Sequence, residues 1–123
     1  MRIASLTVIA AGVLVLGCSV DPRSLYGTYV VRFPAGSSTL TLNQDGTFEQ
    51  FVKRSNGTSD HATGTWFYDR KDASIFLKGD AFDVKDHRIG GVRIDVIEMP
   101  VHRFRAVTIE CDVTQSCTYE KQR

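Results

Sequence analysis

Apolar and polar residues alternate along much of this chain with the period of two that is typical of β-strands. The clearest case is STLTLNQDGTFEQFVK at 38–53, where Leu40 and Leu42 alternate with polar residues. Phe48 and Val52 share one face of the returning segment. The NQDG stretch between the two halves supplies a tight turn, with glycine where a positive φ is needed. The pattern predicts an antiparallel hairpin over 38–53.

Strand-like composition recurs elsewhere, and turn-forming residues interrupt it about every 8–12 residues. No segment shows a sustained helical period. The segment 80–91 has the weakest pattern, with a turn expected at Gly90 and Gly91, and Pro100 is expected to break the strand that precedes it. The further expected strands are 27–33, 62–69, 73–79, 92–99, 101–111 and 118–121, with a turn at 34–37 and a loop at 54–60. About eight short antiparallel strands predict an all-β domain, a barrel or a sandwich that protects its edges.

The N-terminal segment has a different pattern. Met-Arg is followed by an apolar run over 3–16 and then by Gly17 and Cys18. A basic start, a short apolar centre and a small residue at its end are the parts of a secretory signal peptide. A transmembrane helix would need about 20 apolar residues. Val15-Leu16-Gly17-Cys18 resembles the lipobox of bacterial lipoproteins, whereas ordinary signal cleavage would leave Cys18 as a free thiol.

The lipobox resemblance implies a signal peptide at 1–17, a lipid-anchored tether at 18–24 and a β-barrel domain at 25–123. In such lipoproteins the cysteine, here Cys18, carries a diacylglycerol and palmitate and becomes the first mature residue. Their sorting rule retains in the inner membrane a protein with Asp after this cysteine. Ser19 stands there, which implies the outer membrane and a domain that faces the periplasm.

Composition bounds the mature domain. Without residues 1–17 the chain has 106 residues with 14 basic and 14 acidic side chains, enough for one domain. Balanced charge argues against a nucleic-acid partner. Cys111 and Cys117 are the even remainder of cysteines in an exported chain, which predicts a disulfide stapling a terminal hairpin. It would contribute roughly 2–2.5 kcal/mol in the chain-entropy model. A redox pair usually has Cys-x-x-Cys spacing.

The sequence holds little that points to catalysis. His61, His87 and His102 lie far apart without metal-ligand spacing, so no metal or cofactor is expected. Motifs of serine nucleophiles and zinc proteases are missing from the sequence. Acidic pairs such as Asp80 and Asp83 fall in the weakly patterned segment, where carboxylates are usually solvated. These observations favour a protein that binds rather than an enzyme.

Two groups of side chains are candidate ligand or partner contacts. In VHRFRAV, Arg103 and Arg105 flank an aromatic residue and could hold an anionic group or a protein surface, although strand alternation alone also explains them. Trp66 shares a face with Tyr68 in TGTWFY, and Thr65 and Phe67 share the other. Both faces are apolar enough to be covered. Trp66 could line a ligand cavity or simply belong to the core.

Half of the mature chain also resembles a known group. LYGTYVV, STLTLNQDGTFEQ, GTWFYD and SIFLKG are similar to the strand and hairpin pattern of small lipocalin-like domains in bacterial lipoproteins. The resemblance implies an up-and-down barrel or half-barrel that binds hydrophobic molecules or protein partners, without a catalytic motif. A calyx would be lined by a set that also describes a packed interior, Tyr29, Val31, Leu40, Leu42, Phe48 and Trp66.

Two kinds of binding remain open at this point. A carrier or sensor of a hydrophobic small molecule, the leading hypothesis, predicts an interior void. A protein-interaction module, for example an inhibitor of an envelope enzyme or a toxin-neutralising immunity protein, predicts a filled interior and an exposed recognition loop at 54–60 or 80–90. An enzyme comes third and would gather ionisable side chains in one concavity.

Overall fold

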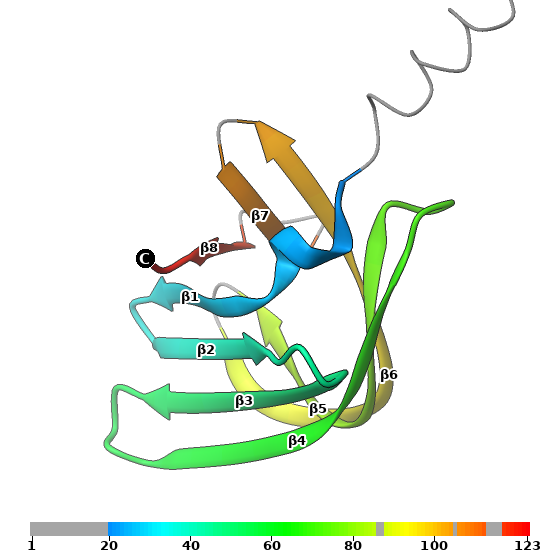
Figure 1. Ribbon diagram of the computed structural model, residues 1–123. Coiled ribbons are helices and arrows are strands. Elements are labelled where there is room, and N and C mark those ends of the chain that lie inside the picture. The colour runs from blue at the N-terminus through cyan, green and yellow to red at the C-terminus, as the bar shows by residue number, and fades with distance from the viewer. Residues whose placement is uncertain (1–19, 86–87, 105, 113–116) are drawn as a thin grey trace, which may run out of the picture.

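The computed structural model describes residues 20–85, 88–104, 106–112 and 117–123. Antiparallel strands pair in chain order, and the first also pairs with the last, so the sheet closes into a barrel (Figure 1). The strands are β1 (Gly27–Phe33), β2 (Gly36–Leu42), β3 (Thr47–Arg54), β4 (Ser59–Asp69), β5 (Ser74–Lys85), β6 (Arg88–Phe104), β7 (Ala106–Asp112) and β8 (Cys117–Lys121), preceded by a 3-10 helix, η1 (Pro22–Leu25). The predicted all-β fold is confirmed, as an up-and-down barrel. Among the described residues, no helix has the length and apolar character to span a membrane.

The hairpin expected over 38–53 is β2 and β3. The Asp45 side chain accepts a hydrogen bond from the Thr47 backbone N–H at 2.9 Å, and Gly46 has a φ of 88°. Such a positive φ is easy for glycine and uncommon for other residues. Leu40 and Leu42 face inward, as the alternation predicts.

The β5–β6 hairpin differs from its prediction. β5 continues to Lys85 and β6 begins at Arg88, so Gly90 and Gly91 lie within a strand and not at a turn. The β5–β6 register shifts at two places. Such irregular pairing departs from the regular alternation by which a strand is recognised in the sequence, which accounts for the weak pattern along 80–91.

Pro100 lies inside β6 and does not end a strand, contrary to the prediction. The neighbouring Val101 N–H points to the β5 side, where it donates to the carbonyl of Ala73, the residue before β5, at 2.8 Å. Because successive residues alternate, the Pro100 nitrogen faces the β7 side. The β6–β7 register begins only at Val101 opposite Ile109. Proline therefore occupies a position where the ladder needs no donor.

The stretch 101–111 is two strands and not the single strand predicted. β6 ends at Phe104 and β7 begins at Ala106. The sequence around this turn, HRFRAV, has no glycine, proline or asparagine. Because those residues mark most tight turns, local chemistry could not indicate the reversal.

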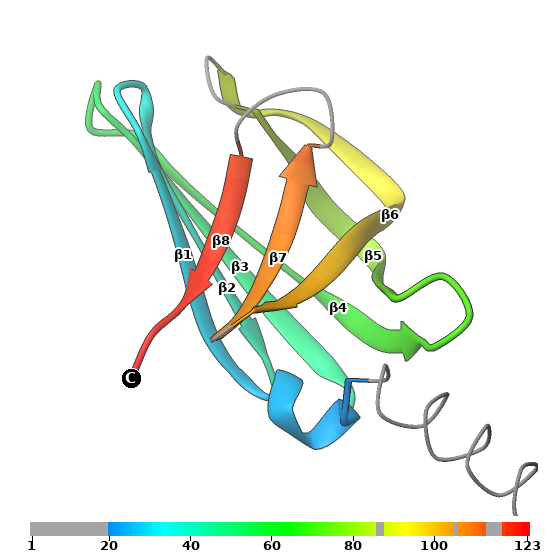
Figure 2. The ribbon, with the colours of Figure 1, turned by 90° about the horizontal axis from the view of Figure 1, so that it is seen from above.

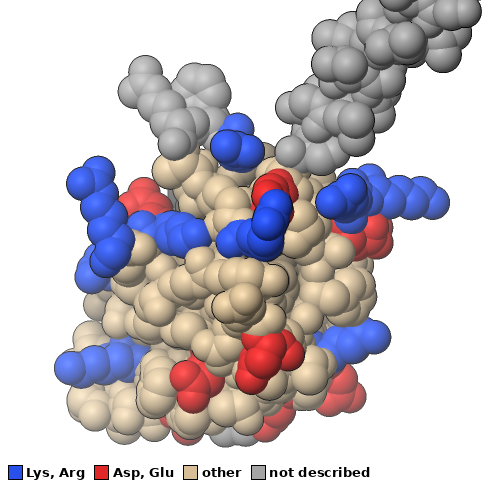
Figure 3. Space-filling model, in the orientation of Figure 1, with Lys and Arg blue, Asp and Glu red and all other residues tan. Residues whose placement is uncertain are grey.

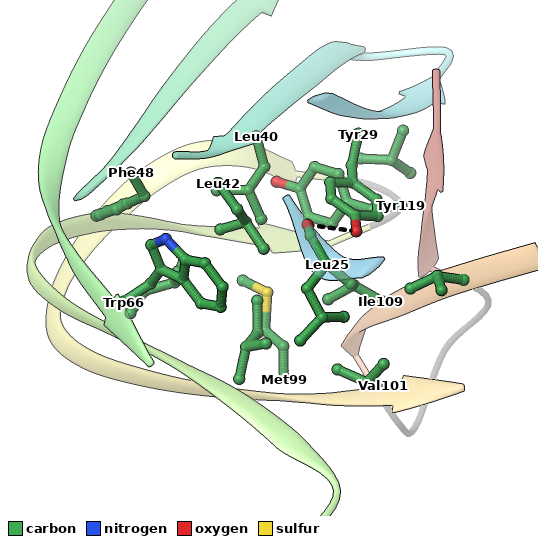
Figure 4. Packing of buried hydrophobic residues seen from close by; sticks show 14 of the residues in the cluster. Leu25, Tyr29, Leu40, Leu42, Phe48, Trp66, Met99, Val101, Ile109 and Tyr119 are labelled. Atoms are coloured by element: carbon green, nitrogen blue, oxygen red, sulfur yellow. Dashed lines mark hydrogen bonds between the residues drawn. The ribbon is translucent and has the colours of Figure 1, made fainter. Parts of the chain in front are cut away.

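The barrel interior is filled by large side chains. Residues of the proposed calyx point inward and pack on each other, and Leu25 of η1 enters the same space (Figure 4). The Tyr29 hydroxyl donates to the Leu25 carbonyl at 2.7 Å, which fastens η1 to the interior. Val20, in the predicted tether, is also buried. The fully buried large residues are Leu25, Tyr29, Leu40, Leu42, Phe48, Gln50, Val52, Ile75, Leu77, Met99, Ile109 and Tyr119.

One face of β4 is exposed, although the sequence predicted that both faces are covered. Trp66 is buried, but Phe67 is 44 % exposed on the outer surface. Its ring stacks on Phe76 of β5 with centroids 5.1 Å apart, and the Lys78 ammonium lies 5.1 Å from its centroid. Aromatic pairing between adjacent strands thus accounts for a residue that alternation alone assigned to a covered face.

A polar network lies within this apolar interior. Gln50 of β3 accepts a hydrogen bond from the Phe82 N–H at 2.7 Å and donates to the Phe82 carbonyl at 3.1 Å. It also donates to the Tyr119 hydroxyl at 3.2 Å, and that hydroxyl lies 2.7 Å from Ser38 Oγ. The β4–β5 register stops at Gly64 opposite Gly79. The Gln50 amide therefore serves as a hydrogen-bonding partner for β5 beyond that point.

The buried tyrosines predict a loss of stability at alkaline pH. Burial raises the pKa of Tyr119 and of Tyr29 to about 12, against about 10 in an unfolded chain. The neutral phenols stabilise the fold fully below pH 10. As pH rises from 10 towards 12, the unfolded chain ionises first, so stability falls by about 1.4 kcal/mol per pH unit for Tyr119. Urea midpoints measured from pH 8 to 11.5 should decrease above pH 10, and less steeply in Tyr119→Phe. Equal slopes in both proteins would contradict this.

The predicted disulfide is confirmed. Cys111 in β7 and Cys117 in β8 are bonded, with Cα atoms 5.4 Å apart. The bond joins the two strands beside their connection, as expected for a stapled hairpin.

The two ends of the barrel differ in what they carry. Because the strands run up and down, η1 and the C-terminus lie at one end, and the β1–β2 and β3–β4 turns lie at the other (Figure 2). We call these the η1 end and the far end.

Candidate binding site at the far end

The aromatic candidates lie in the interior. Trp66 is 8 % exposed, and its Nε1–H donates to the Asn43 carbonyl at 2.9 Å. Its ring meets Tyr26 edge-on, with centroids 5.9 Å apart. Phe48 is fully buried opposite Gly64. Both side chains thus pack against other residues of the barrel and are not open to solvent.

Of the two arginine candidates, the structure describes Arg103, which lies at the η1 end and not at the far end. Arg103 is exposed near the end of β6, beside a His102–Glu110 pair whose Nε2 and Oε1 lie 3.2 Å apart. Arg105 lies outside the described residues. Because Arg103 is exposed whereas Trp66 and Phe48 are buried in the interior, the structure does not bring them together into one site.

A first groove lies where the barrel closes. It has a volume of about 380 Å³ and runs between β1 and β8. The β1–β8 register comprises Tyr29 opposite Lys121 and Val30 opposite Glu120, so the strands separate towards the far end. The groove is lined by Val30, Val31, Arg32, Phe33, Thr118 and Glu120.

A second groove of about 290 Å³ adjoins the first. The two share Arg32 and Phe33, and the second continues across the β1–β2 turn to the end of β3. Ser55 N–H donates to the Ala35 carbonyl at 2.9 Å and ties the two hairpin tips together. The second groove is lined by Arg32, Phe33, Gly36, Ser37, Lys53, Arg54 and Ser55. We call the two together the end groove.

Strand register gathers the cations of the end groove. Arg32 lies opposite Ser37, and Ser37 lies opposite Lys53, so three neighbouring strands present these side chains in one outward row. Arg54 is paired with Asp60 at 2.7 Å. Among the described residues, neither Arg32 nor Lys53 has an ion-pair partner. The second groove therefore has an excess of positive charge that suits carboxylates, phosphates or sulfates.

Comparison with protein-family models, curated proteins and solved structures finds no match. The end groove must therefore be interpreted from its own chemistry.

The sequence partly indicated this site. Under the protein-interaction hypothesis a recognition loop was expected at 54–60 or 80–90. Arg54 and Ser55 from the first segment line the second groove, whereas 80–85 and 88–90 belong to β5 and β6. Arg32 and Lys53 were not singled out, because each is an ordinary polar residue on an alternating strand. The available signal was the alignment of the two predicted hairpins, which places Arg32 and Lys53 on one face of the sheet. No group of three metal-ligating side chains occurs within the described part of the chain.

Proposed function

We propose that this chain is a cell-envelope lipoprotein whose barrel recognises another protein through the end groove. The packed interior is the main support. The side chains that would line a calyx fill the barrel and are buried against one another (Figure 4). A carrier of hydrophobic molecules needs that volume for its ligand, whereas a protein-interaction module is free to fill it. The proposed role is binding without catalysis, with no cofactor.

The position of the end groove also favours this proposal. In the proposed lipoprotein, lipid on Cys18 would be two residues from buried Val20. Two residues span at most about 7 Å, which would keep the η1 end near the outer membrane. The end groove would then face the periplasm. On the face that includes η1, Lys and Arg side chains are more numerous in the upper part, where Asp and Glu side chains lie among them (Figure 3).

Site-specific crosslinking in cells tests the proposal. A photoreactive benzophenone residue at Ser37, in the second groove, should crosslink the full-length lipoprotein to a small set of envelope proteins. The same residue at Thr63, exposed on the outer face of β4, should not. Lipid attachment is tested with the same cells, because a Cys18→Ala chain should leave the membrane fraction.

Three outcomes would contradict the proposal or part of it. Equal crosslinking from Ser37 and Thr63 would mean that contacts are unspecific. A small hydrophobic molecule that co-purifies with the chain, and leaves on denaturation in native mass spectrometry, would support a carrier instead. A Cys18→Ala chain that stays in the membrane fraction would overturn the anchor.

A further inference from the structure

We propose that the end groove binds an acidic, extended segment of the protein partner, which adds as a strand to the free edge of β1. This inference rests on the proposed function and specifies the chemistry of the partner. Two independent features meet at Arg32. Its main chain belongs to an unpaired sheet edge, and its side chain lines both parts of the end groove.

The free edge follows from the register of β1. This strand pairs with β2 along its full length, but with β8 only through Tyr29 and Val30. The Gln122 N–H donates to the Thr28 carbonyl at 2.8 Å, so Thr28 faces β8. Backbone groups alternate sides along a strand. Arg32, four residues later, therefore turns its N–H and C=O to the same side, where the first groove lies.

β8 presents a matching edge. By the same alternation, Thr118 has its backbone groups on the β1 side, as Gln122 does. No register pair joins Thr118 to Arg32 within the described strands. Main-chain hydrogen bonds to such an edge are how extended peptides join sheets. A small anion cannot use these groups in this way, and this favours a polypeptide ligand.

The cations determine the sign of the partner's charge. Arg32 and Lys53 are exposed and lack carboxylate partners in the described chain. Arg54, by contrast, forms an ion pair with Asp60. Glu120 lines the first groove only. The acidic side chains of the partner should therefore lie over Arg32 and the second groove and not beside Glu120. Arg32 can hold a carboxylate with two parallel hydrogen bonds.

Peptide titration tests this inference. The probe is a ten-residue peptide of alternating threonine and glutamate, added to the isotope-labelled full chain in zwitterionic detergent. We expect amide shifts at Arg32, Thr118 and Ser37, slower amide exchange at Arg32, and weaker binding as salt rises. A peptide of alternating threonine and lysine should leave these resonances unchanged.

Matched variants separate the two features. Arg32→Gln keeps the backbone edge and removes one charge, so it should weaken binding about two- to fivefold, and the double variant with Lys53→Gln about tenfold. Lys78→Gln removes an exposed cation beside Phe67, away from the groove, and should have no effect.

Other results would overturn the inference. Binding of inorganic phosphate with the same shifts as the acidic peptide would indicate a general anion site. Absence of shifts with the acidic peptide at low salt, or equal binding of the lysine peptide, would exclude an acidic strand. If crosslinks from Ser37 still form in cells, the protein-recognition function stands and only the acidic partner fails. If neither experiment succeeds, both proposals fall.

Discussion

Replacing Gly64 by alanine should destabilise the barrel by about 3 kcal/mol or more, a large part of the 5–15 kcal/mol typical of a domain. Gly64 lies in β4 between Phe48 of β3 and Gly79 of β5. A Cβ atom there would overlap the Lys78 carbonyl oxygen and lie 3.1 Å from Phe48 Cε2. The obstacle is backbone and a fully buried ring, so neither neighbour can move aside cheaply.

Urea unfolding followed by tryptophan fluorescence measures this effect, because Trp66 is the only tryptophan. The matched control is Gly57→Ala. Gly57 has a φ of 90°, and a Cβ there meets nothing within 4 Å. The control isolates backbone strain, about 1–2 kcal/mol. If Gly64→Ala costs no more than Gly57→Ala, the close strand approach at Gly64 is not a determinant of stability.

Replacing Gln50 by methionine should cost about 2–4 kcal/mol, because the Phe82 N–H and carbonyl both lose their bond to the side-chain amide. Methionine has a similar length and no hydrogen-bonding group of comparable strength. The loss therefore measures the polar pairing and not a cavity. Amide exchange at Phe82 should accelerate in the variant.

Ser38→Ala is the control within the same network. It removes one partner of the Tyr119 hydroxyl but leaves the Gln50 bond to it, so we expect a loss of about 1 kcal/mol. If Gln50→Met and Ser38→Ala lost the same free energy of unfolding, the hydrogen bonds from Gln50 to Phe82 would contribute nothing to stability. A stabilised Gln50→Met would mean that the interior favours apolar contacts over this network.

The candidate site could be predicted only in part. Loop 54–60 was recognisable from its turn residues, and it does border the end groove. The groove itself depends on the separation of β1 from β8, whose paired residues Val30 and Glu120 lie 90 positions apart in the chain. Periodicity describes neighbours along the chain and carries no information about such distant pairing. Trp66 and Phe48 were candidate binding residues because they are aromatic, yet they pack against other core residues.

The sequence by itself determined the local elements. Alternation at Leu40 and Leu42, the NQDG turn and the spacing of Cys111 and Cys117 were sufficient for the β2–β3 hairpin, the disulfide and the all-β class. Each depends on interactions within a few residues, where side-chain period and turn chemistry act directly.

Only the tertiary structure decided the rest. Pro100 is tolerated in β6 because the neighbouring ladder begins one residue later. Gln50 completes the hydrogen bonds of Phe82, which is 32 residues away. The row of Arg32 and Lys53 arises from the register of three strands. In every case the outcome depends on which distant backbone groups meet. The closure of the barrel determines which backbone groups meet, because it pairs strands that are far apart in the sequence and carry no local pattern of their pairing.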